Sequence, residues 1–151
     1  MAYYLGVDYG TGATGIAIGQ DVTYTAQPLT GIPMSKGKVD HASFDKLVKE
    51  WQPAAIVVGL PRNQDNTFTH VSPKVYNFAK WVHKIFSIPV YFMDERNTTT
   101  SAKELIFAKY QYKGLQKHKV DAVSAALILQ AYFDGEEYQT FDPQVSLEEL
   151  E

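Results

Sequence analysis

Three short apolar runs, separated by turn residues, open the chain. They span Tyr3–Tyr9, Thr14–Gly19 and Val22–Ala26. None shows the 3.6-residue period of an amphipathic helix, and each has the length of a strand. Gly10-Thr11-Gly12 links the first pair, and Gly19-Gln20-Asp21 is a tight hairpin signal. The pattern predicts an antiparallel three-stranded meander that ends at Pro28, followed by a loop over residues 30–39.

Helical and strand patterns alternate after this meander. Asp40 and Ser72-Pro73 have the chemistry of helix starts, and apolar residues recur at helical spacing after each. Ala54–Leu60 and Val90–Met93 are continuous apolar runs of strand length, typical of strands covered on both faces. Two further helices are predicted, Ser101–Tyr110 with a capping box at its start, and Val120–Phe133.

The resulting element order, β-β-β-α-β-α-β-α-α, predicts an α/β fold. Right-handed crossovers after an antiparallel meander give a mixed five-stranded sheet with helices on both faces. The expected strand order is 3-2-1-4-5, with the first three strands antiparallel, which resembles the ribonuclease H-like arrangement. One domain is expected over residues 1–134, because a domain usually has roughly 100–200 residues. Residues 135–151 are expected to be an acidic, flexible C-terminal tail.

Composition and charge narrow the class of protein. The chain has no cysteine, which excludes disulfides and thiolate metal sites. Its N-terminus lacks the pattern of a signal peptide, and no apolar run approaches the roughly 18 residues of a membrane span. Net charge is −3, but residues 120–151 hold eight acidic side chains and no Lys or Arg. The remaining 119 residues carry 14 basic and nine acidic side chains, so the body of the protein is mildly basic and compatible with a polyanionic partner.

Three carboxylates stand where the predicted topology would bring them together. Asp8 lies near the end of the first strand, Glu95 just after the strand Val90–Met93, and Asp121 at the start of the last helix. Sites in open α/β sheets gather beyond the carboxyl ends of the strands. Each acid also has a structural interpretation: Asp8 could cap the turn, Glu95 could pair with Arg96, and Asp121 could favour the positive end of the helix dipole. The three together favour a metal site.

Carboxylate oxygens select hard cations, so Mg²⁺ or Mn²⁺ is expected. Two such ions about 3.5–4 Å apart would clamp a scissile phosphate, with Asp8 as the bridging ligand. The four histidines show no zinc spacing.

Candidate substrate contacts flank these acids. Gly10 and Thr11 follow Asp8, although Thr11 could equally shape the turn. Arg62 and Asn63 follow the strand Ala54–Leu60 and are candidate phosphate ligands. Further cationic candidates are Arg96, which could instead hold Glu95, and Lys117 and Lys119 in the basic loop 109–119. Lysines of such a loop neutralise phosphates and its aromatic rings can stack on unpaired bases, although most basic loops are simply solvated.

Five motifs occur in the order that is typical of one protein family. They are Asp8-Tyr-Gly-Thr, Gly-Ile-Ala-Ile-Gly at 15–19, Gly59-Leu60-Pro61-Arg62-Asn63 with Asp65 and Thr67, Asp94-Glu95-Arg96 with Thr98-Thr99, and Lys117/Lys119 with Val120-Asp121-Ala122-Val123-Ser124-Ala125. The chain resembles the YqgF/RuvX family over roughly residues 3–133. That family is described as Holliday-junction resolvases and as nucleases of pre-16S rRNA processing. One departure is that Gly12, Ala13 and Thr14 stand where the family usually has a basic residue or two.

The resemblance implies metal-dependent phosphodiester cleavage in the bacterial cytoplasm, with Asp8, Glu95 and Asp121 in the acidic positions. The expected function is 5′-end maturation of pre-16S rRNA, Holliday junction resolution, or both, and the expected partner is RNA or branched DNA. A monomer or a homodimer would fit. Two alternatives stay open: a nucleotide-binding module, because Asp8-Tyr-Gly-Thr-Gly also resembles the first phosphate loop of actin-like ATPases, and a non-catalytic RNA-binding protein.

Overall fold

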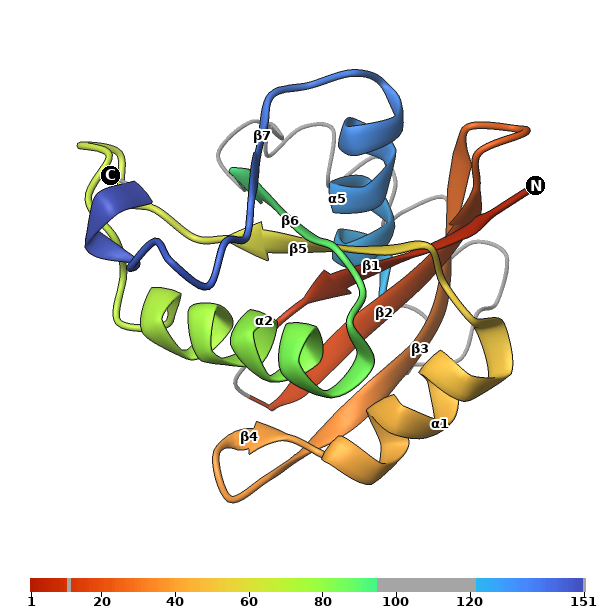
Figure 1. Ribbon diagram of the computed structural model, residues 1–151, viewed down its shortest axis with the longest axis horizontal. Coiled ribbons are helices and arrows are strands. Elements are labelled where there is room, and N and C mark those ends of the chain that lie inside the picture. Colours follow the sequence, from red (N-terminus) through yellow and green to blue (C-terminus); the bar gives the residue numbers. More distant parts are fainter. Residues whose placement is uncertain (11, 95–121, 151) are drawn as a thin grey trace.

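A twisted sheet between two layers of helices forms the protein (Figure 1). The computed structural model describes residues 1–10, 12–94 and 122–150. Its strands are β1 (Tyr3–Asp8), β2 (Ala13–Gln20), β3 (Thr25–Ser35), β4 (Lys38–Val39), β5 (Ala55–Leu60), β6 (Val90–Asp94) and β7 (Tyr138–Thr140). Its helices are α1 (His41–Trp51), α2 (Ser72–Phe86), α5 (Val123–Phe133) and the short 3₁₀ helix η2 (Glu148–Leu150). No helix in these ranges is long and apolar enough to cross a membrane.

The strand order confirms the predicted α/β class. Seven strands follow the order β4-β3-β2-β1-β5-β6-β7. The first three strands pair antiparallel, while β1 pairs with β5 and β5 with β6 in parallel. The predicted order of five is therefore the centre of the sheet. The expected strand count of five is too low, because β4 and β7 each add a short edge strand.

The third strand differs from its prediction. Val22–Ala26 was expected to be a strand that ends at Pro28, but β3 begins at Thr25 and continues through both prolines to Ser35. Only Met34 and Ser35 pair with β4, so most of one edge of β3 has no strand partner in the described ranges. A proline's missing N–H costs no ladder hydrogen bond at such an edge.

Helix α1 begins as predicted, but helix α2 does not. The Asp40 side chain accepts a hydrogen bond from the Ser43 N–H and caps α1. The prediction that Ser72 caps α2 is wrong, since the helix already includes Ser72. The Ser72 hydroxyl instead donates to the Pro61 carbonyl at 2.6 Å and accepts from the Thr69 N–H at 2.9 Å. It therefore ties the loop after β5 to the start of the helix.

Successive side chains of β1 point to opposite faces of the sheet and so belong to two different hydrophobic cores. Leu5, Val7 and Tyr9 belong to the larger core, which includes apolar side chains of α1 and α2. The intervening residues face α5: Tyr4 contacts rings of that helix, and Gly6 lies against its backbone. Because side chains alternate along a strand, Asp8 has the parity of the α5 face.

Helix α5 packs directly on β1 at Gly6. A Cβ at Gly6 would lie 2.7 Å from the Ala125 carbonyl oxygen and 2.7 Å from the Leu129 Cβ. Two turns beyond Ala125, a Cβ at Gly19 would lie 2.5 Å from the Phe133 ring, and Gly19 pairs with Tyr4 near the start of β1. Helix α5 therefore runs antiparallel to β1, and its N-terminal end lies toward Asp8.

The segment after α5 returns to the sheet. β7 pairs antiparallel with β6, Phe141 is buried beside Phe92 and Tyr76, and the Tyr76 hydroxyl donates to the Val145 carbonyl. The residues that were expected to be a tail thus supply an edge strand and part of the core. The division of the chain at residue 134 stays a prediction.

The Arg62 side chain holds this C-terminal segment. Its guanidinium donates to the Leu150 carbonyl at 2.8 Å, to Gln139 Oε1 at 3.1 Å and to the Asn66 carbonyl at 3.2 Å. The same group lies 4.4 Å from the centre of the Phe68 ring. One side chain therefore joins the loop after β5 to both β7 and η2.

We expect Gly6→Ala to destabilise the protein, because the new methyl group would meet the backbone of α5. Overpacking of this kind costs about 1–3 kcal/mol of unfolding free energy. Urea denaturation measures the change. The matched control is Gly12→Ala, where an added Cβ would meet nothing within 4 Å. Equal stability of the two variants would contradict the close packing of α5 on β1.

We expect Arg62→Ala to release the C-terminal segment. The loss of hydrogen bonds from a charged donor should cost about 1.5–3 kcal/mol. Relative to the wild type, the exchange of backbone amide hydrogens should become faster at β7 and η2 and stay unchanged at α1. Lys84→Ala, an exposed cation at the far end of α2, is the control and should leave both rates unchanged. Unaltered exchange at β7 in Arg62→Ala would refute the tether.

Candidate active site

The carboxyl ends of β1, β5 and β6 meet at one edge of the sheet. Val7 of β1 pairs with Val58 of β5, and Leu60 of β5 pairs with Asp94 of β6. The three strands are parallel, so they all end on this side, as the arrowheads in Figure 1 show. Ligand sites of open α/β sheets form at such an edge.

Asp8 is the last residue of β1 and is half-buried at this edge. It pairs with Gly15 of β2, which has no side chain to cover it. Its parity places it on the face that α5 covers. A carboxylate in this position is partly withdrawn from water, and partial desolvation favours an arrangement that supplies a compensating positive charge.

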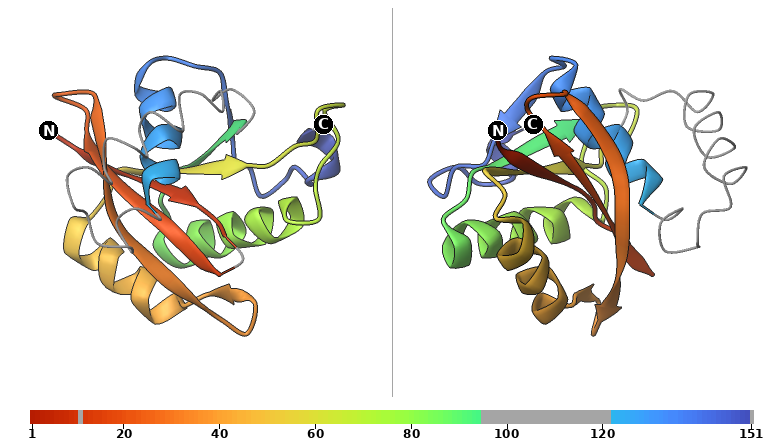
Figure 2. Two further views of the ribbon diagram at one scale, coloured as in Figure 1. Left: turned by 180° about the vertical axis from the view of Figure 1, so that it is seen from behind. Right: turned by 90° about the vertical axis from the view of Figure 1, so that its right-hand side faces the viewer.

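The start of α5 approaches the same edge. Ala122 precedes the helix, and both Ala122 and Val123 are fully buried. Among the residues that the structure describes, no side chain caps this end. The N–H groups of the first turn and the positive end of the helix dipole are directed toward the edge that carries Asp8. Figure 2 shows α5 against the sheet from two further directions.

Several predicted site residues lie outside the described ranges. They are Thr11, Glu95, Arg96, Lys117, Lys119 and Asp121, together with the predicted helix Ser101–Tyr110 and the basic loop 109–119. Of the three predicted metal ligands, the structure describes Asp8 alone. Among residues 1–10, 12–94 and 122–150, no three His, Asp or Glu side chains gather in a way that could hold a metal ion.

Gly10 has a steric role in the turn after β1. A Cβ there would lie 2.0 Å from the Ala13 carbonyl oxygen, so no side chain fits while the chain reverses into β2. This close backbone approach explains the glycine without a ligand. The predicted contact of Gly10 with substrate stays a prediction.

Arg62 and Asn63 shape the loop that follows β5. Arg62 holds the C-terminal segment, as described above. The Asn63 side chain donates to Thr67 Oγ1 at 3.0 Å and to the Phe68 carbonyl at 3.3 Å, and Asp65 accepts from the Thr67 N–H. Both residues therefore have structural partners, and their predicted phosphate contacts stay predictions.

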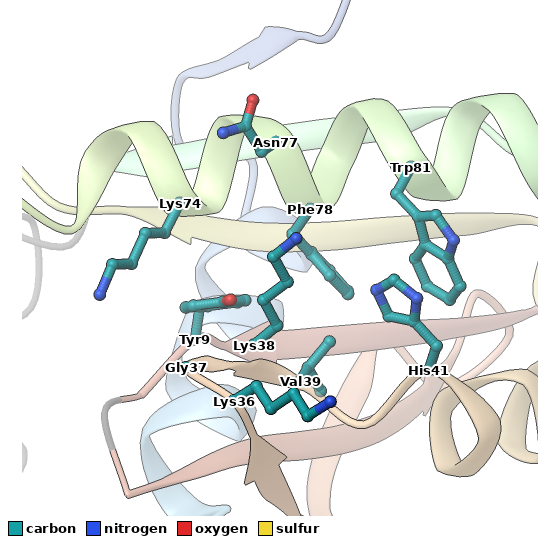
Figure 3. A pocket seen from close by; sticks show the side chains of 10 residues that line it. All are labelled: Tyr9, Lys36, Gly37, Lys38, Val39, His41, Lys74, Asn77, Phe78 and Trp81. Carbon is teal, nitrogen blue, oxygen red and sulfur yellow. The ribbon is translucent and has the colours of Figure 1, made fainter.

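A basic cavity beside β1 has no counterpart among the residues predicted from sequence. It measures about 440 Å³ and lies between the β3–β4 turn and α2, next to Tyr9 (Figure 3). Its lysines are Lys36, Lys38 and Lys74. The only sequence signal was the pair of lysines around Gly37, in a stretch that was expected to be an ordinary loop.

Sequence comparisons identify related proteins along almost the whole chain. Residues 2–135 match the family model described as "RuvX: Holliday junction resolvase". A relative from Aeromonas hydrophila is 46% identical over 130 residues, which cover 86% of this chain and 93% of the relative. One from Klebsiella pneumoniae is 41% identical over 131 residues, with 87% and 95% coverage. Both carry the name "Putative pre-16S rRNA nuclease".

Solved structures share the fold at low sequence identity. RuvC from T. thermophilus, in complex with a Holliday junction substrate, superposes with a TM-score of 0.59 at 17% identity, covering 92% of this chain and all of RuvC. The fowlpox virus Holliday junction resolvase gives a TM-score of 0.53 at 15% identity, with 87% and 96% coverage. These likenesses confirm the predicted ribonuclease H-like fold. From the match over residues 2–135 and the identity to the bacterial relatives, the chain belongs to the RuvX Holliday junction resolvase family.

Proposed function

We propose that this protein is a metal-dependent endonuclease that hydrolyses phosphodiester bonds in structured nucleic acid. The observation that carries the proposal is the meeting of the ends of β1 and β6 with the start of α5, with Asp8 on the face that α5 covers. Family membership supports nuclease activity. The names of the relatives support pre-16S rRNA maturation, and the family description supports junction resolution.

Asp8, Glu95 and Asp121 are the proposed metal ligands. Glu95 directly follows the end of β6, and Asp121 directly precedes the buried residue Ala122. Tyr91 and Met93, in the strand that leads to Glu95, belong to the α5 side of the sheet. An all-carboxylate set suits Mg²⁺ or Mn²⁺, and we propose two ions. Bound there, the ions would neutralise the scissile phosphate and activate the attacking water.

The chain's own residues would bind and orient the substrate. The start of α5 offers N–H groups and a positive dipole to an anionic group at the edge. Gly10, next to Tyr9 and two residues after Asp8, lets the backbone pass close to the Ala13 carbonyl at the start of β2. Lys117 and Lys119 are proposed to neutralise flanking phosphates, with Thr11, Arg62, Asn63 and Arg96 as further contacts.

We propose that the protein recognises its nucleic-acid substrate by overall shape and by contacts to phosphates, and not by base sequence. Side chains that reach base edges give sequence specificity, whereas contacts to phosphates position the substrate without reading it. A bacterial cytoplasmic location fits an rRNA or junction substrate. Either a monomer or a homodimer is compatible with the single site on each chain.

We expect Asp8→Asn to abolish cleavage while leaving the fold and nucleic-acid binding intact. Loss of a metal ligand removes several kcal/mol of charge stabilisation, and each ~1.4 kcal/mol is a factor of ten, so the rate should fall by about three orders of magnitude. Cleavage of junction DNA and of precursor 16S rRNA is measured side by side with Mg²⁺ and with Mn²⁺. Circular dichroism checks the fold.

The matched control is Asp134→Asn, which neutralises a carboxylate at the opposite end of α5. It should cleave like the wild type. Undiminished cleavage by purified Asp8→Asn would contradict the proposed metal mechanism. The relative rates on the two substrates decide between rRNA maturation and junction resolution.

A further inference from the structure

The cavity beside Tyr9 is lined by lysines from two sides (Figure 3). Lys36 comes from the turn between β3 and β4, Lys38 is the first residue of β4, and Lys74 comes from the first turn of α2. All three side chains are exposed. A phosphate at the mouth of the cavity would therefore meet positive charge from both sides.

No carboxylate among the described residues lines the cavity to offset its positive charge. Its ten lining residues include three lysines and no carboxylate, and no ion pair involves these lysines in the part of the chain that the structure describes. Asp40 lines an adjoining hollow that shares Lys36 and Lys38 with the cavity. Its carboxylate is already used as the cap of α1.

The interior of the cavity is apolar and aromatic. Val39 and Phe78 are buried, and Tyr9 is almost as well covered. Burial raises the pKa of the Tyr9 hydroxyl, with a hydrogen bond to the Val39 backbone acting in the opposite direction, so the phenol stays neutral. At one end His41 and Trp81 stack, with ring centres 3.8 Å apart and planes inclined by 13°. Flat apolar surfaces under cationic rims suit a ligand with a planar ring and a phosphate.

The cavity adjoins the proposed active site. Tyr9 directly follows Asp8, and the two residues have opposite parity, so their side chains belong to opposite faces of the sheet at the same edge. The first residue of β2, Ala13, pairs with Pro33, and β3 continues beyond it to Ser35. The β3–β4 turn with its lysines thus extends past the edge on which Asp8 lies.

We propose that this cavity binds one unpaired nucleotide of the substrate strand, next to the bond that the active site cleaves. The base would lie against Tyr9 and Phe78, and its flanking phosphates would contact Lys38 and Lys74. The inference rests on the proposed nuclease function and narrows its substrate to one with a single-stranded flank. A volume of about 440 Å³ falls within the usual range of small-ligand pockets. A duplex does not offer free base faces, because its bases stack on each other.

The first test measures the lysine contacts by salt dependence. Fluorescence anisotropy follows a labelled single-stranded oligouridylate of about ten nucleotides binding to Asp8→Asn protein in EDTA, where no cleavage can occur. Lys38→Gln/Lys74→Gln should reduce the slope of log K against log salt by about 1.4, since each phosphate contact to a single strand contributes about 0.7. The control Lys80→Gln/Lys84→Gln removes the same charge from exposed positions of α2 outside the cavity and should keep the slope.

The second test asks whether the base enters. Trp51→Phe leaves Trp81 as the only tryptophan, and a base that stacks in the cavity should quench its fluorescence. Single-stranded oligouridylate should quench saturably, whereas a blunt duplex of equal length and salt should not. Lys38→Gln/Lys74→Gln should shift the quenching curve to about tenfold higher concentration, the factor that corresponds to 1.4 kcal/mol.

Equal slopes in the two lysine pairs, or equal quenching by the duplex, would overturn the proposal. These outcomes are separable from a failure of the nuclease proposal. Binding is measured without metal in a protein that lacks the Asp8 carboxylate, so an inactive enzyme can still fill the cavity. Conversely, a protein that cleaves normally but shows neither effect would retain the nuclease function and lose the nucleotide site.

Discussion

The contact of α5 with Gly6 determines how the rest of the proposed site is arranged. A helix normally stands off a sheet by the length of its side chains, but here its backbone lies against a residue that has none. The helix is therefore fixed in height and direction over β1. With Phe133 beside Gly19, its N-terminal end can only face the edge at which Asp8 ends the strand. One steric constraint thus aligns a carboxylate, a helix dipole and the carboxyl ends of two neighbouring strands.

The same edge serves different purposes on its two faces. Asp8 belongs to the α5 face, where the metal ligands are proposed to gather. Tyr9 belongs to the other face and opens onto the basic cavity between β4 and α2. Beside both, Arg62 fastens the C-terminal segment to the loop after β5. A substrate strand that wraps around this edge would meet the reaction centre and a nucleotide site in sequence along its backbone.

Sequence patterns predicted the centre of the sheet because buried strands such as Ala55–Leu60 are continuously apolar. They failed at the edges. β3 runs through Pro28 and Pro33 because an open edge tolerates a missing N–H, and the short strand β7 is held by Phe141 and by Arg62, a residue that is remote in sequence. Local patterns carry little information about such remote partners.

The residues of the candidate site could likewise be predicted from sequence only in part. Asp8 could be predicted as a site residue, because a carboxylate at the end of an apolar strand is costly to desolvate unless a positive charge compensates it. The cavity was not, because its lysines come from a turn and a helix start that are separated by some 36 positions of sequence and that only the fold brings together. Gly10 illustrates a third case: its steric role is evident only when the Ala13 carbonyl is seen above it.

The most direct test of the account is paramagnetic broadening of backbone amide resonances by Mn²⁺ in the wild-type protein. If the acids at the ends of β1, β6 and α5 bind the metal together, substoichiometric Mn²⁺ should broaden Asp8, Asp94 and Ala122 first and in parallel. The amides of Glu136 and Glu148, in the acidic C-terminal segment, should stay sharp. Broadening that begins at Glu136 or Glu148, or that affects Asp8 without Asp94 and Ala122, would contradict a shared metal site at this edge.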